Sequence, residues 1–398
     1  MKIGVYYVES TNADGENINR YNHELVDRLA EMTGLEIRFV ELEEAKDQDM
    51  LLVFIGGGGT EGRFKAALPE LPHPVLLMTT GYNNSLAASM EILSYLEQNG
   101  IRGEIIHGSE EKMASRIAVL ARVFAAKKKI NHLRLGSIGK PSDWLISSDV
   151  DKKKSLEKNG ITIVDVSMTE FFMEVNKKEY EDNEWTRMVK AKNWHPEDVE
   201  ISCSIYGALK RLAEKYELDG MSVRCFDLLQ PFKGTGCMAL AVLNAEGVYA
   251  GCEGDMPSLI SMAVLGELTG QPVFQANPSR ILTDTDEIIF AHCTLPLNMP
   301  TDIELMSHFE SGLGIAFRGR IPEGPCTIFK TSGLLDRCFV KTGLLEENLK
   351  ETNLCRTQIK IKLEKEDLNY FLTHSIGNHH LIVSGDYEEL IKEFYRWL

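Results

Sequence analysis

The stretch GVYAGCEGDMPSLISMAVLGELT, Gly247 to Thr269, carries the most informative pattern in the sequence. It begins as a short apolar strand and continues as an apolar helix that opens near Pro257. Between these elements stand Glu253 and Asp255, two carboxylates at the carboxyl end of the strand. Ligands of open α/β sheets bind at this end of the strands, so the pattern predicts an α/β sheet with a polar site at its edge.

Strands and helices alternate on both sides of this stretch. Near-continuous apolar strands between amphipathic helices predict parallel sheets that are covered on both faces. The run KKKIN at 127–131 interrupts the alternation, which then restarts and continues through the predicted strands 272–277 and 287–293. After Pro300 the apolar runs become short, partly alternating and separated by Gly and Pro, which is typical of an antiparallel sheet or small barrel.

These patterns predict an α/β protein in three parts. The first two are doubly wound parallel-sheet domains, 1–131 and 132–299, and the second carries the site. The third, 300–398, is a mostly antiparallel β domain that ends in a closing helix at 387–398.

Composition narrows the range of functions. The chain has 398 residues and a formal net charge of −16, which argues against a nucleic-acid surface. The opening MKIGVYYVES turns polar after eight positions, so we predict neither a signal peptide nor a membrane span. The eight cysteines form no C-x-x-C pair, which favours free thiols in a reducing cytoplasm.

Polar residues gather at the ends of several predicted strands. The strand 272–277 ends in Asn277, with Arg280 just beyond, and the strand 287–293 contains His292 near its end. The pair His379 and His380 stands at the start of a later strand. Carboxylate, amide and imidazole groups at one crevice suit a divalent metal of intermediate softness, with Mn²⁺ or Fe²⁺ favoured over structural zinc.

Structural interpretations remain open for several of these residues. Asp255 stands just before Pro257 and can cap the following helix, whereas Glu253 is too early to cap it well. His292 in an apolar strand can be an ordinary core histidine. Adjacent histidines point to opposite sides of a strand, so one of His379 and His380 is expected to face the site. Cys252 and Cys293 fit small buried side chains better than nucleophiles.

The glycine run IGGGGTEG, Ile55 to Gly62, raises a separate question. It lacks the Gly-Lys-Ser/Thr ending of a phosphate-binding loop and the context of a dinucleotide fingerprint. A tight turn that brings the backbone close to a ligand or a neighbouring subunit is the better interpretation.

The combination of CEGD at 252–255, AHCT at 291–294 and NHH at 378–380 resembles the L-fucose isomerase and L-arabinose isomerase superfamily. TTGYNNSLAASMEIL at 79–93 also resembles that group, so the likeness spans essentially the whole chain and is greatest to its shorter, fucose isomerase-like members. The resemblance implies an intracellular, Mn²⁺-dependent aldose–ketose isomerase that acts on a small sugar. It also implies a homo-oligomer, a trimer or hexamer.

The resemblance assigns roles to single positions. Glu253 matches the catalytic, metal-binding glutamate, and Asn277 stands where the family has a second metal-binding acid. His292 is similar to a metal histidine of the arabinose isomerase branch, and His379 is favoured over His380 as the C-terminal metal ligand. Asn277 is a departure, because an amide can ligate a cation but cannot transfer a proton at neutral pH.

Isomerisation through an ene-diol needs a group that removes and returns a proton, and often a second group for the hydroxyl proton. Glu253 is predicted to be the first, with Asp255 as a candidate for the second. His380, Arg280 and Lys233 are predicted to contact substrate, and the two cationic side chains favour an anionic one. The alternatives are a metal-assisted aldol or retro-aldol enzyme on a keto-sugar or sugar acid, and a non-catalytic carbohydrate-binding relic.

Overall fold

The computed structural model describes residues 1–10 and 15–398. These residues form two compact units: the first joins Met1–Lys128 to Glu393–Leu398, and the second is Lys129–Lys392.

The first unit is built on a parallel sheet of five strands in the order β2-β1-β3-β4-β5. All six residues of β3, MLLVFI, are buried, as expected for a strand covered on both faces. The strands are β1 Ile3–Val8, β2 Ile37–Phe39, β3 Met50–Ile55, β4 Val75–Met78 and β5 Gly103–Ile106. The helices are α1 Gly15–Thr33, η1 Leu42–Asp47, α2 Glu61–Ala67, η2 Leu68–Glu70, α3 Ser85–Gln98 and α4 Glu110–Ile130, the last of which ends in the second unit.

The glycine run after β3 forms a tight turn that packs against its own unit. A Cβ atom on Gly56 would lie 2.5 Å from the Tyr7 hydroxyl, and one on Gly57 would lie 2.9 Å from the Ser10 hydroxyl. Side chains cannot be accommodated at such distances without rearrangement. Close packing of the backbone therefore accounts for these two glycines.

The second unit begins with a parallel sheet of four strands in the order β7-β6-β8-β9. Its strands are β6 Arg134–Ile138, β7 Thr162–Val166, β8 Gly220–Val223 and β9 Tyr249–Cys252. Its helices are α5 Lys152–Asn159, α6 Met168–Asn176, α7 Glu184–Ala191, α8 Pro196–Tyr216, η3 Cys225–Leu228, α9 Leu229–Phe232, α10 Cys237–Ala245 and α11 Met256–Thr269.

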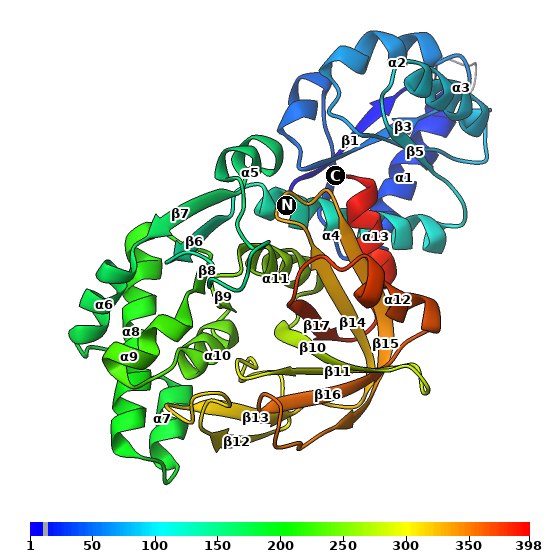
Figure 1. The fold of residues 1–398 in the computed structure, drawn as a ribbon. Helices are drawn as coiled ribbons and strands as arrows, with labels where there is room; N and C mark the ends of the chain where they lie inside the picture. The colour runs from blue at the N-terminus through cyan, green and yellow to red at the C-terminus, as the bar shows by residue number, and fades with distance from the viewer. Residues whose placement is uncertain (11–14) are drawn as a thin grey trace. The chain divides into compact units, whose positions relative to one another are not determined.

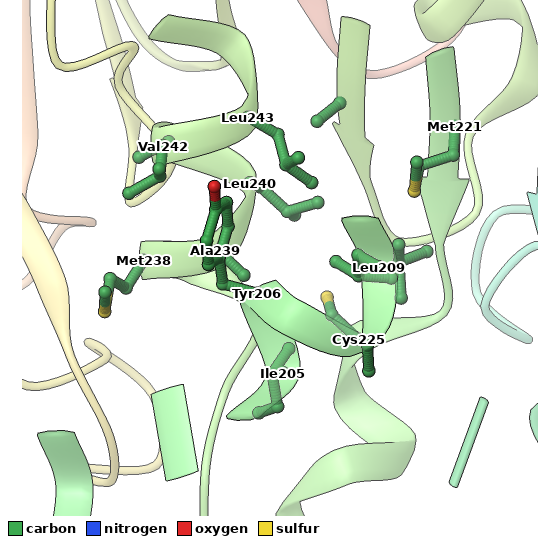
Figure 2. Packing of buried hydrophobic residues seen from close by; sticks show 14 of the residues in the cluster. Ile205, Tyr206, Leu209, Met221, Cys225, Met238, Ala239, Leu240, Val242 and Leu243 are labelled. Carbon is green, nitrogen blue, oxygen red and sulfur yellow. The ribbon is translucent and has the colours of Figure 1, made fainter. Parts of the chain in front are cut away.

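Buried side chains of α8, α10 and the sheet form one large apolar cluster. Figure 2 shows part of it, where Leu209 of α8 and Leu240 of α10 lie near Met221 of β8. Helix α11 contacts β8 and β9 of the sheet and also two later strands, β14 (Gly324–Thr331) and β17 (His380–Ser384). A helix between two layers is buried all round, which explains why its sequence is almost entirely apolar.

The remaining strands of the second unit form a closed antiparallel barrel in the order β10-β11-β16-β15-β14-β17 (Figure 1). Its strands are β10 Phe274–Leu282, β11 Glu287–His292, β14 Gly324–Thr331, β15 Cys338–Asn348, β16 Thr357–Lys362 and β17 His380–Ser384. A separate hairpin pairs β12 Asp302–Met306 with β13 Ala316–Arg320. Helix α12 is Lys365–Thr373, and the closing helix α13 is Glu388–Arg396.

The predicted architecture, two parallel-sheet α/β parts followed by antiparallel β structure, is confirmed. The placement of β10 and β11 in the second parallel sheet was wrong, because they pair antiparallel with each other and close the barrel through β17 and β16. Their apolar runs look alike in both settings, since a strand buried between a barrel core and an outer layer is also apolar on both faces.

Two further expectations concern cysteines and membranes. All eight cysteines lie among the described residues, and none forms a disulfide. None of the described helices is both long enough and apolar enough to cross a bilayer.

Candidate active site and metal centre

Strand β9 ends in a turn that projects Glu253 from the sheet edge. The Asp255 N–H donates to the Cys252 carbonyl at 3.2 Å, and the two central residues, Glu253 and Gly254, have φ values of +64° and +71°. This is the pattern of a type I′ turn. A Cβ on Gly254 would lie 2.6 Å from the Lys140 carbonyl oxygen, so glycine is required there. A glutamate at positive φ costs on the order of 1–3 kcal/mol, and such strain is concentrated at functional sites.

The carboxylate of Glu253 is buried, with 8 % of the residue exposed. Its Oε2 accepts a hydrogen bond of 2.7 Å from the Trp144 indole N–H, and its Oε1 lies 3.6 Å from Nε2 of His379. Burial acts to raise the pKa of Glu253, but His379 and Trp144 outweigh it and hold the pKa below its ordinary value. Glu253 is therefore an anion with one oxygen held and the other facing His379.

Trp144 is a site residue that the sequence interpretation missed. It lies in the loop SDWLISSD after β6. No local sequence pattern distinguishes it, and only its contact with Glu253 in the structure identifies it. Its ring packs edge-to-face against Phe226, with centroids 4.9 Å apart, although about half of the side chain remains exposed. Trp144 and Phe226 thus form an aromatic pair beside the Glu253 carboxylate.

Asp255 caps α11, one of the two roles left open for it, and it also binds His379. Its Oδ1 accepts from the Ser258 N–H at 2.9 Å and so caps α11, while its Oδ2 accepts from Nδ1 of His379 at 2.9 Å. The Ser258 hydroxyl donates to Oδ2 at 2.6 Å. Burial acts to raise the pKa of Asp255, but Lys330 and these hydrogen bonds hold it far below its usual range. A fully hydrogen-bonded carboxylate of this kind orients His379 and has no free oxygen for substrate.

Lys330 is the second residue that sequence reasoning missed. It is 1 % exposed, donates to the Ser258 hydroxyl at 2.5 Å, and lies 3.8 Å from Oδ2 of Asp255. Burial lowers the pKa of Lys330, and the Asp255 carboxylate opposes that effect. Alternation along β14 places Lys330 on the same face as the buried Cys326 and Ile328. A lysine on an apolar face was the signal that could have found it.

His379 precedes β17 and joins the two carboxylates. Its Nδ1 bonds Asp255, and its Nε2 is buried without a hydrogen-bond partner among the described residues. Burial acts to lower the pKa of His379, but the hydrogen bond to Asp255 and the nearby Glu253 raise it to about 9. When His379 is neutral, a proton on Nδ1 leaves the Nε2 lone pair directed towards Glu253, the arrangement found in carboxylate–histidine–metal sites.

His292, the last residue of β11, lies against this group. It is 4 % exposed, its ring centroid is 5.3 Å from that of His379, and its Nδ1 lies 2.7 Å from the Thr294 hydroxyl. Burial, aided by the charge of His379, lowers the pKa of His292 to about 4. The ring is therefore neutral at physiological pH and has a lone pair for a ligand.

Asn277 on β10 also presents an unsatisfied atom. Its Oδ1 is buried and has no hydrogen-bond partner in the described part of the chain. Gln275, two residues earlier on the same face, accepts from the Cys252 N–H at 2.9 Å. This face of β10 is therefore directed towards the end of β9.

Three predicted substrate-contacting residues do not join the cluster. His380 points to the other side of β17, where Nε2 lies 3.0 Å from the Tyr370 hydroxyl and Nδ1 lies 3.0 Å from the Asn378 carbonyl. Arg280 forms a bidentate ion pair with Glu351, at 2.9 and 2.8 Å. Lys233 is an exposed residue at the end of α9. Their contact with substrate stays a prediction.

The donor set fits a divalent cation. The buried Nε2 of His379 and Oδ1 of Asn277 lack partners, and the Glu253 carboxylate supplies negative charge 3.6 Å from the first of them. Buried polar atoms without partners are uncommon and call for an explanation such as an ion. Oxygen and imidazole donors together suit an ion such as Mn²⁺.

The chain is similar to proteins named sulfoquinovose isomerase from Priestia aryabhattai and Priestia megaterium. Each is 23% identical over 305 residues, which cover 73% of this chain and 68% of the relative. A sulfoquinovose isomerase from a Clostridium species is 22% identical over 194 residues, 46% of this chain and 43% of that protein. No protein-family model matches the sequence.

Proposed function

We propose that this protein is a metal-dependent isomerase that interconverts an aldose and a ketose, with Glu253 as the proton-transfer group. The observation that carries the proposal is the buried, conformationally strained Glu253, whose Oε1 lies 3.6 Å from Nε2 of His379. The similarity to three proteins named as sugar isomerases supports the reaction class.

The reaction moves one proton between neighbouring carbons. Glu253 removes the proton from C2 of the aldose, the C2–H electrons form a C1=C2 bond, and the carbonyl oxygen gains a proton. The ene-diol then loses its O2 proton, C2 becomes a carbonyl, and Glu253 returns a proton to C1. Trp144 holds Oε2 of Glu253, which leaves Oε1 to exchange the proton. Because the carboxylate is buried beside a histidine, it is shielded from competing water.

A divalent ion would be held by Glu253, His379 and Asn277, with His292 as a further nitrogen ligand. Such an ion supplies Lewis-acid polarisation of the sugar oxygens. Asp255 contributes by fixing the His379 ring, and its own oxygens are occupied by hydrogen bonds. The hydroxyl proton must therefore move through water or a histidine rather than through Asp255.

We infer that the substrate is an anionic sugar. The relatives are named for sulfoquinovose, a sulfonated hexose. A neutral Asn277 also gives the metal one negative charge fewer than a second acid would, and an anionic substrate group compensates for it. Arg280 is already paired with Glu351, so a substrate anion would have to compete for it.

The test is incubation of the purified chain with Mn²⁺ and sulfoquinovose, glucose or fucose in D₂O, followed by NMR and mass spectrometry. We expect conversion of the sulfonated aldose to its ketose, with deuterium at the carbon that gained the proton. Cleavage into two smaller fragments would favour the aldol alternative. Absence of any conversion across the sugar set would contradict the proposal.

A further inference from the structure

Two thiols stand beside the proposed catalytic centre and have no part in the reaction described above. Cys252 is the last residue of β9, and Cys225 opens η3 directly after the neighbouring strand β8. The strands are parallel, with Val223 paired with Cys252. Their ends bring the two Sγ atoms to 3.0 Å from each other.

These thiols are continuous with a cluster of metal-ligating side chains. One ligand atom each from Cys252, Glu253 and His292 lies within 4.8 Å of the other two, and all three residues are buried. Cys225, 5 % exposed, adds a fourth ligand atom through its contact with Cys252. Two sulfurs, one imidazole and one carboxylate make a complete ligand set for a tetrahedral ion.

We propose that Cys225, Cys252, Glu253 and His292 form a binding site for a thiophilic divalent ion such as Zn²⁺ or Cd²⁺. The site differs from the oxygen- and nitrogen-ligated centre proposed above in its two sulfur ligands, and the two sites share Glu253 and His292. On binding, each thiol releases one proton to solvent and the ion gains two thiolate ligands, so no oxidant or reductant is needed. Sulfur selects zinc over manganese.

The ligand atoms must rearrange to hold an ion. Zinc–sulfur bonds of about 2.3 Å and zinc–nitrogen bonds of about 2.0 Å place ligands roughly 3.3–3.8 Å apart. The two sulfurs, 3.0 Å apart, must therefore separate, while the ligand atoms of Cys252, Glu253 and His292, which lie within 4.8 Å of one another, must move closer together. A small cavity of about 10 Å³ borders Cys225, with Phe226, Cys237 and His308 in its lining.

The shared ligand has a consequence for activity, which rests on the proposed function. An ion bound through this set draws Glu253 away from the proposed Mn²⁺ centre, so that centre loses a ligand and its proton-transfer group. Zn²⁺ is therefore expected to inhibit the isomerase, and excess Mn²⁺ to relieve the inhibition by competition for Glu253.

The test uses Co²⁺ as a spectroscopic substitute for zinc on the full chain. We expect an intense near-ultraviolet sulfur-to-cobalt charge-transfer band that saturates at about one ion per chain. Cys252→Ser and Cys225→Ser should each reduce the band by about half, since each thiolate contributes separately. Cys326→Ser is the matched control, because Cys326 is a buried thiol within the barrel core, and its band should equal that of the parent.

X-ray absorption at the zinc edge of the unmutated protein covers the case in which the Cys252 variant does not fold. Sulfur scatterers at about 2.3 Å support the site. A zinc shell of nitrogen and oxygen alone, or a cobalt band unchanged in Cys252→Ser, would overturn it. The spectra do not depend on catalysis, so a sulfur-ligated ion in a protein without isomerase activity would contradict the proposed function and leave this site standing.

Discussion

The two parallel sheets of this protein end in different ways at their carboxyl edges. In the first unit the polar groups that follow β3 and β4 satisfy one another: Ser85 bonds both the Thr79 hydroxyl and the Ile55 carbonyl. In the second unit the residues near the end of β9 include buried atoms without partners among the described residues, on His379 and Asn277. Similar sheets thus end in a hydrogen-bonded edge in one unit and in an edge with unsatisfied buried polar atoms in the other.

The difference between the two sheet edges comes from the barrel, which packs against the second sheet's edge. His379 and Lys330 belong to barrel strands or the residues next to them, and both contact the α11 cap at Asp255. The first sheet has no comparable layer among the described residues of its own unit. Fold class alone therefore says little about function, and the buried charges at one sheet edge carry the functional argument.

The largest expected difference between the two units is the loss of stability when a paired lysine is replaced. Lys330→Met leaves Asp255 without its buried cation, and removal of one partner of a buried pair costs about 3–5 kcal/mol of unfolding free energy. In the first unit Lys128→Met breaks a 2.7 Å pair with Asp49 in which Lys128 is largely exposed, and the expected loss is about 0–1 kcal/mol. Urea unfolding measures both losses. Equal losses would show that Lys330 has no special electrostatic role.

Replacing a glutamate at the end of a strand in each sheet tests which sheet edge takes part in turnover. The two residues are Glu253 and Glu9. Glu253→Gln keeps the side-chain volume but removes the basic oxygen, and turnover should fall at least about 100-fold. Glu9→Gln alters the exposed glutamate that follows β1, and turnover should be unchanged. Steady-state kinetics gives the values, and thermal melting confirms that both variants fold. Parent-like turnover in Glu253→Gln would reduce that residue to a structural role.

Metal affinity should depend on pH through His379. The pKa of His379 is raised to about 9 in the metal-free protein, so the ring is protonated at pH 7 and an ion must displace that proton. The affinity for Mn²⁺ should rise about 10-fold per pH unit as pH increases from 6.5 to 8.5 and level off near 9.

Calorimetric titrations at several pH values measure this slope. His380→Ala is the control: the pKa of His380 is lowered to about 3, and the slope should persist in the variant. A parent protein whose affinity is flat over this range would remove His379 from the ligand set.

Asn277→Asp should have the smallest effect. The added negative charge should tighten Mn²⁺ binding about 3–10-fold and weaken an anionic substrate by a similar factor through repulsion. Calorimetry for the ion and KM for sulfonated and neutral sugars test the two changes. Mn²⁺ affinity indifferent to the substitution would place Asn277 outside the centre.

Much of the fold could be predicted from the sequence, because periodicity and local turns depend on neighbouring residues. The architecture and the cap at Asp255 are of this kind. The pairing of β10 and β11 was not predictable, since the same apolar strand suits a parallel sheet or a barrel.

Long-range contacts account for the missed site residues. Trp144 and Glu253 are 109 positions apart, and Lys330 and Ser258 are 72 apart. No local pattern encodes such contacts. Alternation along β14 nevertheless offered a clue, because it placed Lys330 on a buried face.

The most direct test of a metal centre at Glu253 is calorimetric titration of Mn²⁺ into the metal-free protein at pH 8, with His379→Ala and His380→Ala alongside. We expect the parent to bind about one ion per chain and to gain thermal stability as the ion concentration rises. His379→Ala should lose at least about 10-fold in affinity, whereas His380→Ala should lose less, because its ring contacts Tyr370 instead of Glu253. Absence of Mn²⁺ binding to the parent, with a melting temperature that does not change across the titration, would contradict the account.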